Sequence, residues 1–101
     1  MRKSERHKFQ TKMWVYQGSG AWYFVTLPRE LSDRIRAMTA GSRSAWGSVR
    51  VEAAIGRTKW NTSLFPDKKA GAYLLPVKAE VRRKEAIGEG STVTVVLELR
   101  A

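Results

Sequence analysis

Apolar and polar residues alternate along several stretches of the chain, as they do in a strand that buries one face. Alternation of this kind runs through residues 9–16, 48–55 and 92–99. Residues 21–27 (AWYFVTL) are rich in β-branched and aromatic side chains, which also favour strand. Shorter candidate strands cover residues 58–64 and 72–75. The pattern therefore predicts a β-rich chain.

Two segments have helical spacing instead. Leu31, Ile35 and Met38 recur on one side of a helix that would begin after Pro28, and proline suits a first helical turn. Residues 77–86 are predicted to form a second short helix. Turn residues lie between the elements, and we expect the hairpin turn Gly18-Ser19-Gly20 and a loop over residues 65–71.

The two halves of the chain repeat one order of elements. Residues 23–28 (YFVTLP) and 73–76 (YLLP) each read as an aromatic strand that ends in Leu-Pro and leads into a helix. Each helix is followed by Gly-Ser and an alternating strand, at Gly47-Ser48 and Gly90-Ser91. A unit that cannot bury its own apolar face is expected to pack against its copy. The sequence therefore predicts an all-β split barrel with two short helices and an internal pseudo-duplication.

The length of 101 residues corresponds to one domain. Residues 1–8 are charged and polar, so we expect a flexible basic tail ahead of a single domain over residues 9–101. The absence of cysteine excludes disulfides and thiolate metal sites. The sequence contains no apolar run of membrane length, so we expect a cytoplasmic protein without membrane contact. The oligomeric state stays open, with a monomer allowed.

Charge is the most pronounced global property: 19 Lys and Arg stand against nine Asp and Glu, a net charge of +10. Such an excess attracts polyanions, although a generally soluble surface would also explain it. The candidate residues for binding an anion or nucleic acid are Arg50 and the cluster Lys78, Arg82 and Arg83. Glu80 lies within the same predicted helix, so a self-neutralised, solvated helix face is the alternative.

A second candidate site is the segment 57–63 (RTKWNTS), which combines an indole with hydroxyl, amide and cationic groups. Trp60, Thr62 and Ser63 are the candidate rim of a ligand pocket. The alternative, which the residue types favour, is an ordinary strand with Trp60 in the core. The chain has four tryptophans; we expect at least two in the core, and an exposed subset would suit base stacking.

No catalytic constellation is recognisable. His7 is the only histidine and lies in the expected tail, so no catalytic residue, metal ligand or cofactor is predicted. Neither Gly18-Ser19-Gly20 nor Gly88-Glu89-Gly90 has the lysine and spacing of a phosphate-binding loop. We expect a protein that is not an enzyme.

Five phrases of the sequence stand out together: residues 46–51 (WGSVRV), Ile55-Gly56, 60–66 (WNTSLFP), 73–78 (YLLPVK) and 81–83 (VRR). In these phrases the chain resembles a bacterial family of uncharacterised small domains. The resemblance implies a double-split β-barrel fold and carries no established activity. A more distant similarity links the Leu27-Pro28 and Leu75-Pro76 steps to DNA-binding barrels of the AbrB and antitoxin types, which pair two chains where this chain supplies both halves.

The leading functional hypothesis is a non-enzymatic domain that binds nucleic acid or another anionic partner. It rests on the net charge and on the distant fold analogy, which is only an analogy about function. The alternatives are a module that binds a small ligand and an accessory domain that binds another protein. An exposed apolar patch would favour the last of these.

Overall fold

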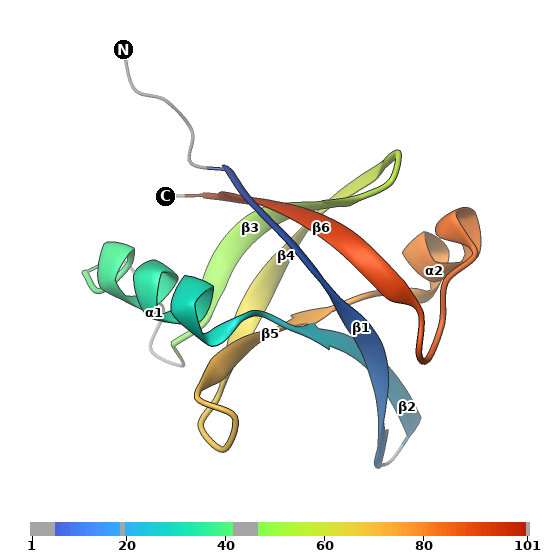
Figure 1. The fold of residues 1–101 in the computed structure, drawn as a ribbon, viewed down its shortest axis with the longest axis horizontal. Helices are drawn as coiled ribbons and strands as arrows, with labels where there is room; N and C mark the ends of the chain where they lie inside the picture. The colour runs from blue at the N-terminus through green and yellow to red at the C-terminus, as the bar shows by residue number, and fades with distance from the viewer. Residues whose placement is uncertain (1–5, 19, 42–46, 101) are drawn as a thin grey trace.

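Six strands close into one barrel in the computed structural model, which describes residues 6–18, 20–41 and 47–100. Neighbouring strands follow the order β1-β2-β5-β4-β3-β6, and every pair is antiparallel (Figure 1). The predicted all-β barrel with two short helices is therefore confirmed. The elements are β1 (Arg6–Gly18), β2 (Gly20–Thr26), α1 (Arg29–Met38), β3 (Val49–Ile55), β4 (Thr58–Asp67), β5 (Ala72–Pro76), α2 (Ala79–Glu85) and β6 (Thr92–Leu99).

The barrel is split because two long strands change partners along their length. β1 pairs with β6 up to Lys12 and with β2 from Met13 onwards. β4 pairs with β3 up to Leu64 and with β5 from Phe65 onwards. Each long strand therefore passes from one sheet to the other, and the sheets diverge on either side of the crossing.

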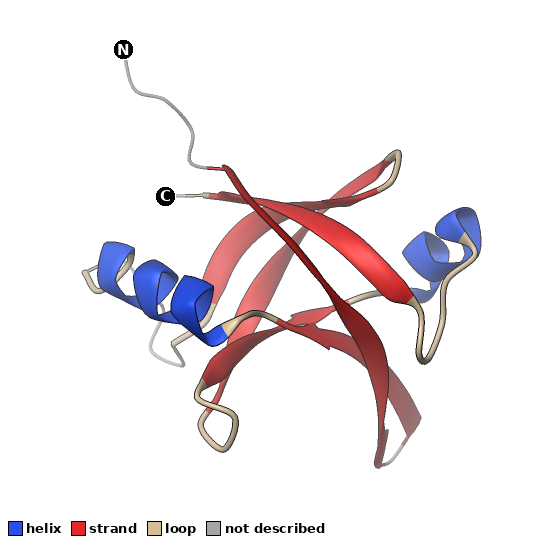
Figure 2. Cartoon of the chain, in the orientation of Figure 1, coloured by secondary structure: helices blue, strands red, loops and turns tan. Residues whose placement is uncertain are grey.

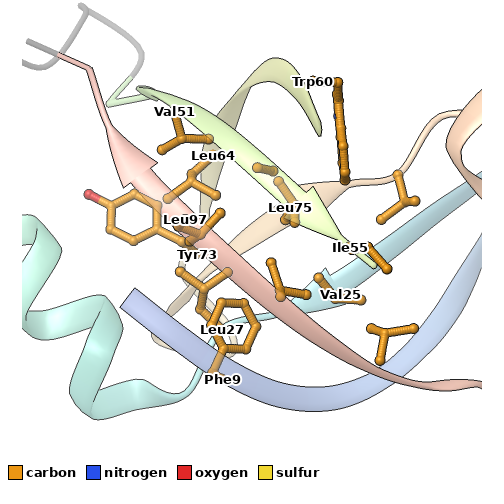
Figure 3. Packing of buried hydrophobic residues seen from close by; sticks show 14 of the residues in the cluster. Phe9, Val25, Leu27, Val51, Ile55, Trp60, Leu64, Tyr73, Leu75 and Leu97 are labelled. Atoms are coloured by element: carbon orange, nitrogen blue, oxygen red, sulfur yellow. The ribbon is translucent and has the colours of Figure 1, made fainter. Parts of the chain in front are cut away.

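The interior of the barrel is a continuous apolar core. Inward side chains alternate along each strand, as in β3, whose Val49, Val51, Ala53 and Ile55 are all buried. Figure 3 shows how side chains from both sheets meet in this core. Burial of this apolar surface is the main contribution to the stability of such a domain.

The two helices lie at opposite ends of the barrel (Figure 2). Exchanging β1-β2-α1-β3 with β4-β5-α2-β6 leaves the barrel order unchanged, so the two halves are topologically equivalent. Each helix contacts a tyrosine of the other half: α1 packs on Tyr73 of β5, and α2 packs on Tyr23 of β2. The halves therefore hold each other together, as the repeat predicted.

The register of the repeat differs from the one expected. Leu27-Pro28 joins β2 to α1, and the equivalent connection between β5 and α2 is Val77-Lys78. Pro76 instead lies in β5, opposite Phe24, because the second strand continues through its proline. The two Leu-Pro steps are thus not structurally equivalent. The Gly-Ser steps are equivalent, since Gly47 and Gly90 both have positive φ and both immediately precede a Ser and a strand.

Two strands are longer than the sequence predicts. β1 begins at Arg6, and His7 is buried opposite Leu97, so residues 6–8 belong to the barrel and the expected tail is too long. β4 continues to Asp67 through the expected loop, since Phe65 and Pro66 pair with β5. β4 does not pair with β3 beyond Leu64, so the missing N–H of Pro66 breaks no hydrogen bond to β3.

The helices are also shorter or turned differently from the prediction. On α1, Ile35 is buried as expected, but Met38 is 43% exposed and the polar Ser32 is buried instead. α2 begins only at Ala79 and ends at Glu85. Among the described residues, neither of these helices nor any other is long and apolar enough to cross a membrane.

Candidate anion-binding pocket

A pocket of about 310 Å³ opens at the α2 end of the barrel. It lies where β4 still pairs with β3 while β5 pairs with β2, so the diverging sheets leave a gap between them. The helix covers one side of this gap, anchored by Glu85, whose carboxylate accepts hydrogen bonds from Arg57 N and Thr58 Oγ1. The described residues that line the pocket are Ala21, Trp22, Tyr23, Trp60, Asn61, Thr62, Pro76, Val77, Lys78 and Arg82.

Arg82 is held in the pocket by two contacts. Its guanidinium carbon lies 3.6 Å from the centroid of the Tyr23 ring, a cation–π contact. Its Nε donates a hydrogen bond of 3.2 Å to the backbone oxygen of Val77. Because both contacts act on a half-buried side chain, the charge is oriented before any ligand arrives.

Lys78 supplies a second cation beside Arg82 at the exposed start of α2. Its Nζ lies 3.8 Å from a carboxylate oxygen of Glu80, which also receives Lys84 Nζ at 3.3 Å. Exposed pairs of this kind contribute little stability, so an anion can compete for Lys78. None of the described residues that line the pocket is acidic.

At the α1 end, the equivalent tyrosine is packed more tightly. There Tyr73 is buried, and its backbone N–H donates to the buried hydroxyl of Ser32 at 3.0 Å. The guanidinium carbon of Arg36 lies 5.6 Å from the Tyr73 ring centroid, farther than Arg82 from Tyr23. Tyr23 remains only partly buried. The two equivalent tyrosines therefore differ: Tyr73 is buried under α1, whereas Tyr23 stays accessible beside Arg82.

The structure brings together four of the seven predicted site residues. Lys78 and Arg82 from the anion set and Trp60 and Thr62 from the ligand rim all line this one pocket. Trp60 is only 8% exposed and belongs to the core, so its role at the pocket is that of a wall.

The other three predicted residues lie outside the pocket lining. Arg50 and Ser63 face each other across β3 and β4, and Arg83 is exposed elsewhere on α2. The outer face beside Arg50 mixes charges of both signs: Arg100 pairs with Glu52 at 3.4 Å. Of the four predicted basic residues, the pocket lining therefore includes Lys78 and Arg82 but not Arg50 or Arg83.

Sequence reasoning did not single out Tyr23, and it did not say which tryptophans would be exposed. Of the three described tryptophans, only Trp60 is buried; Trp14 is half-buried and Trp22 is 56% exposed. Trp46 lies outside the described residues. The signal was available in residues 21–27, where the alternation that places Val25 inside places Trp22 and Phe24 outside.

The exposed aromatic residues form a second hollow of about 400 Å³ on the outer face of β1, β2, β5 and β4. Trp22 pairs with Tyr16 across β1 and β2, and Phe65 pairs with Leu74 across β4 and β5. We call this surface the aromatic face; its described lining residues are Tyr16, Trp22, Phe24, Phe65, Leu74 and Pro76. Trp22 and Pro76 line both hollows, so the aromatic face adjoins the cationic pocket.

Within residues 6–18, 20–41 and 47–100, no three His, Asp or Glu side chains gather where they could hold a metal ion. No curated protein matches the chain. A family model described as a domain of unknown function, DUF1905, matches residues 9–97. That match spans the barrel from β1 to β6, including every residue of the pocket. The chain therefore belongs to the DUF1905 family of domains of unknown function.

Proposed function

We propose that this domain is a non-catalytic binding module for nucleic acid or a related phosphate-bearing polyanion, and that the α2-end pocket receives a phosphate. The observation that carries the proposal is the placement of Arg82, stacked on Tyr23 and next to Lys78, in a pocket whose described lining has no carboxylate.

The chemistry of the two cations suits a phosphate. Arginine presents planar donors that match phosphate oxygens, and lysine adds a point charge. The hydrogen bond to Val77 uses Nε of Arg82, so the terminal guanidinium nitrogens are the donors for a ligand. Asn61 and Thr62 add uncharged hydrogen-bonding groups to the lining.

Two properties of the whole chain support the same partner. The net charge of +10 steers polyanions toward the protein over long distances. The distant similarity to AbrB-type DNA-binding barrels is also part of this proposal, through the two mutually packed halves. We further propose a cytoplasmic location, where nucleic acid is accessible.

The test compares two lysines that share one partner. Lys78 and Lys84 both pair with Glu80 and are similarly exposed, but only Lys78 belongs to the described pocket lining. Binding is measured by fluorescence anisotropy with labelled DNA, as single strand and as duplex, at two salt concentrations. We expect Lys78→Gln to weaken binding roughly fivefold at ~50 mM salt and to flatten the salt dependence, because one phosphate contact is lost.

The control Lys84→Gln carries the same charge change and is expected to bind within about twofold of the wild type. Equal effects of the two substitutions would show that only bulk charge matters and would reject the pocket. A wild-type protein that binds neither DNA form at ~50 mM salt would reject the whole proposal, because phosphate-dominated binding strengthens as salt falls.

A second candidate function is docking of another protein, which the aromatic face favours. Large contiguous apolar patches are uncommon on monomeric proteins and often mark interaction sites. A small-ligand module is the third, since the pocket volume of about 310 Å³ reaches the lower end of the range for small-molecule sites. If the pocket binds a small ligand, a mononucleotide added at a concentration equal to that of the protein should displace the labelled DNA.

A further inference from the structure

The aromatic face exposes large apolar side chains that are not part of the barrel core. Tyr16 and Trp22 are each 56% exposed, and Phe65 is 46% exposed. All three project from the outer side of strands whose inner side already fills the core. Keeping large rings in water forgoes the free energy of burying them, so this surface points to a partner.

The rings of the aromatic face lie next to one another on adjacent strands. Trp22 and Tyr16 are direct cross-strand neighbours, and Phe24 lies beside them on the same face of β2. Trp14 supports Phe24 from β1, with ring centroids 5.2 Å apart, and its indole N–H donates to Thr26 Oγ1 at 2.8 Å. These contacts hold Phe24 in place, so this part of the aromatic face is formed before a ligand binds.

The aromatic face borders the pocket that contains Lys78 and Arg82. Trp22 and Pro76 separate the aromatic face from the pocket that holds Lys78 and Arg82, and each lines both hollows. A ligand that crosses from one hollow to the other therefore meets flat apolar rings first and positive charge next. A strand of nucleic acid offers the same sequence of chemistry, with a planar base attached to a phosphate.

We propose that the aromatic face binds single-stranded nucleic acid, with unpaired bases stacked on Trp22 and its neighbours while a phosphate lies at Lys78 and Arg82. The proposal rests on the function proposed above and names the form of the partner. Bases inside a duplex are already stacked on each other, whereas unpaired bases are available to stack on aromatic side chains.

Charge decides between this occupant and a second copy of the chain. Two copies, each with a net charge of +10, repel when their faces approach, whereas a polyanion is attracted. The cations at the border of the aromatic face add to this preference, because a symmetric contact would bring Lys78 and Arg82 of both copies near one interface.

The experiment measures anisotropy of a labelled oligothymidylate, a hairpin duplex of equal phosphate number, and heparin as a polyanion without bases. We expect the single strand to bind more tightly than the duplex or heparin. Trp22→Ala should weaken binding of the single strand roughly fivefold to a hundredfold, since a stacking partner is lost. Phe65→Ala, at a residue that lines the aromatic face but not the cationic pocket, should also weaken binding of the single strand and leave heparin binding unchanged.

Met38→Ala is the matched control, because Met38 is also a large exposed apolar residue but lies on α1 at the other end of the barrel. Thermal melting of each variant verifies that it folds. If the duplex binds as tightly as the single strand and Trp22→Ala has no effect, stacking is overturned, while a loss with Lys78→Gln would still support the proposed function.

Two further results would also overturn the inference. If no polyanion binds the wild type, both the proposed function and the stacking site fail together. If the wild type sediments as a dimer that Trp22→Ala dissociates, the aromatic face is an interface between copies. Binding of an apolar protein partner that the oligothymidylate does not displace would likewise assign the face to protein docking.

Discussion

Ala86 shows how one residue can be held against its own preference. It caps α2 with φ 55° and ψ 48°, the left-handed conformation that costs an L-residue roughly 1–2 kcal/mol. The conformation is maintained because the Ile87 N–H returns to the Arg82 oxygen at 3.0 Å and closes the helix. The same turn therefore ends the helix that carries Arg82.

Replacing this residue should stabilise the protein. We expect Ala86→Gly to raise the free energy of unfolding by about 0.5–1 kcal/mol, because glycine adopts the left-handed conformation without the steric cost. Chemical denaturation monitored by tryptophan fluorescence measures the change. Ala79→Gly, at the first residue of the same helix, is the control and should not stabilise; an equal gain in both would contradict the explanation.

At the scale of elements, polar contacts decide how each helix sits on the barrel. On α1 the fully buried Ser32 accepts the Tyr73 N–H, which joins the first half of the chain to the second. On α2 the Glu85 carboxylate binds the turn between β3 and β4 through Arg57 N and Thr58 Oγ1. The Tyr73 contact gives the buried Ser32 hydroxyl a partner, which apolar periodicity alone could not indicate.

We predict that Ser32→Ala destabilises the fold by about 1–3 kcal/mol, because the Tyr73 N–H would be left buried without its acceptor. The better helix propensity of alanine offsets only a few tenths of this amount. Thermal or urea unfolding tests it. Ser63→Ala on the outer side of β4 is the matched control and should change stability by less than about 0.5 kcal/mol; a similar loss there would refute the assigned role.

At the scale of the whole molecule, the excess positive charge acts on stability as well as on binding. A net charge of +10 on a barrel with a Cα radius of gyration of 13.2 Å produces self-repulsion that folding must overcome. Salt screens this repulsion without altering the packed core. The same charge that attracts a polyanion therefore destabilises the free protein.

The melting temperature should rise when salt increases from about 10 mM to about 150 mM, where the Debye length falls from roughly 30 Å to roughly 8 Å. A gain of about 1 kcal/mol would correspond to a rise of about 4–8 °C for a domain of this size. The double variant Lys68→Glu and Lys69→Glu, in the exposed loop after β4, should respond less. An identical response of both proteins would contradict the repulsion argument.

The sequence by itself determined the strands, the two helices and the pairing of two similar halves, because alternation and helical spacing are local patterns that the residues carry wherever they lie. Period-two alternation correctly placed β6 at residues 92–99, for example. The charge and the residue types of the sequence also indicated Lys78 and Arg82 as part of one candidate site, and Trp60 and Thr62 as part of another.

Only the tertiary structure decided that these two candidate sites are one pocket. Trp60 and Lys78 line the same pocket because β4 and β5 pair with different neighbours there, which no local sequence pattern indicates. The tertiary structure also decided which Leu-Pro step begins a helix, because cross-strand pairing places Pro76 opposite Phe24 within the sheet. Pairing across the barrel is a long-range property, and it sets which side chains share a surface.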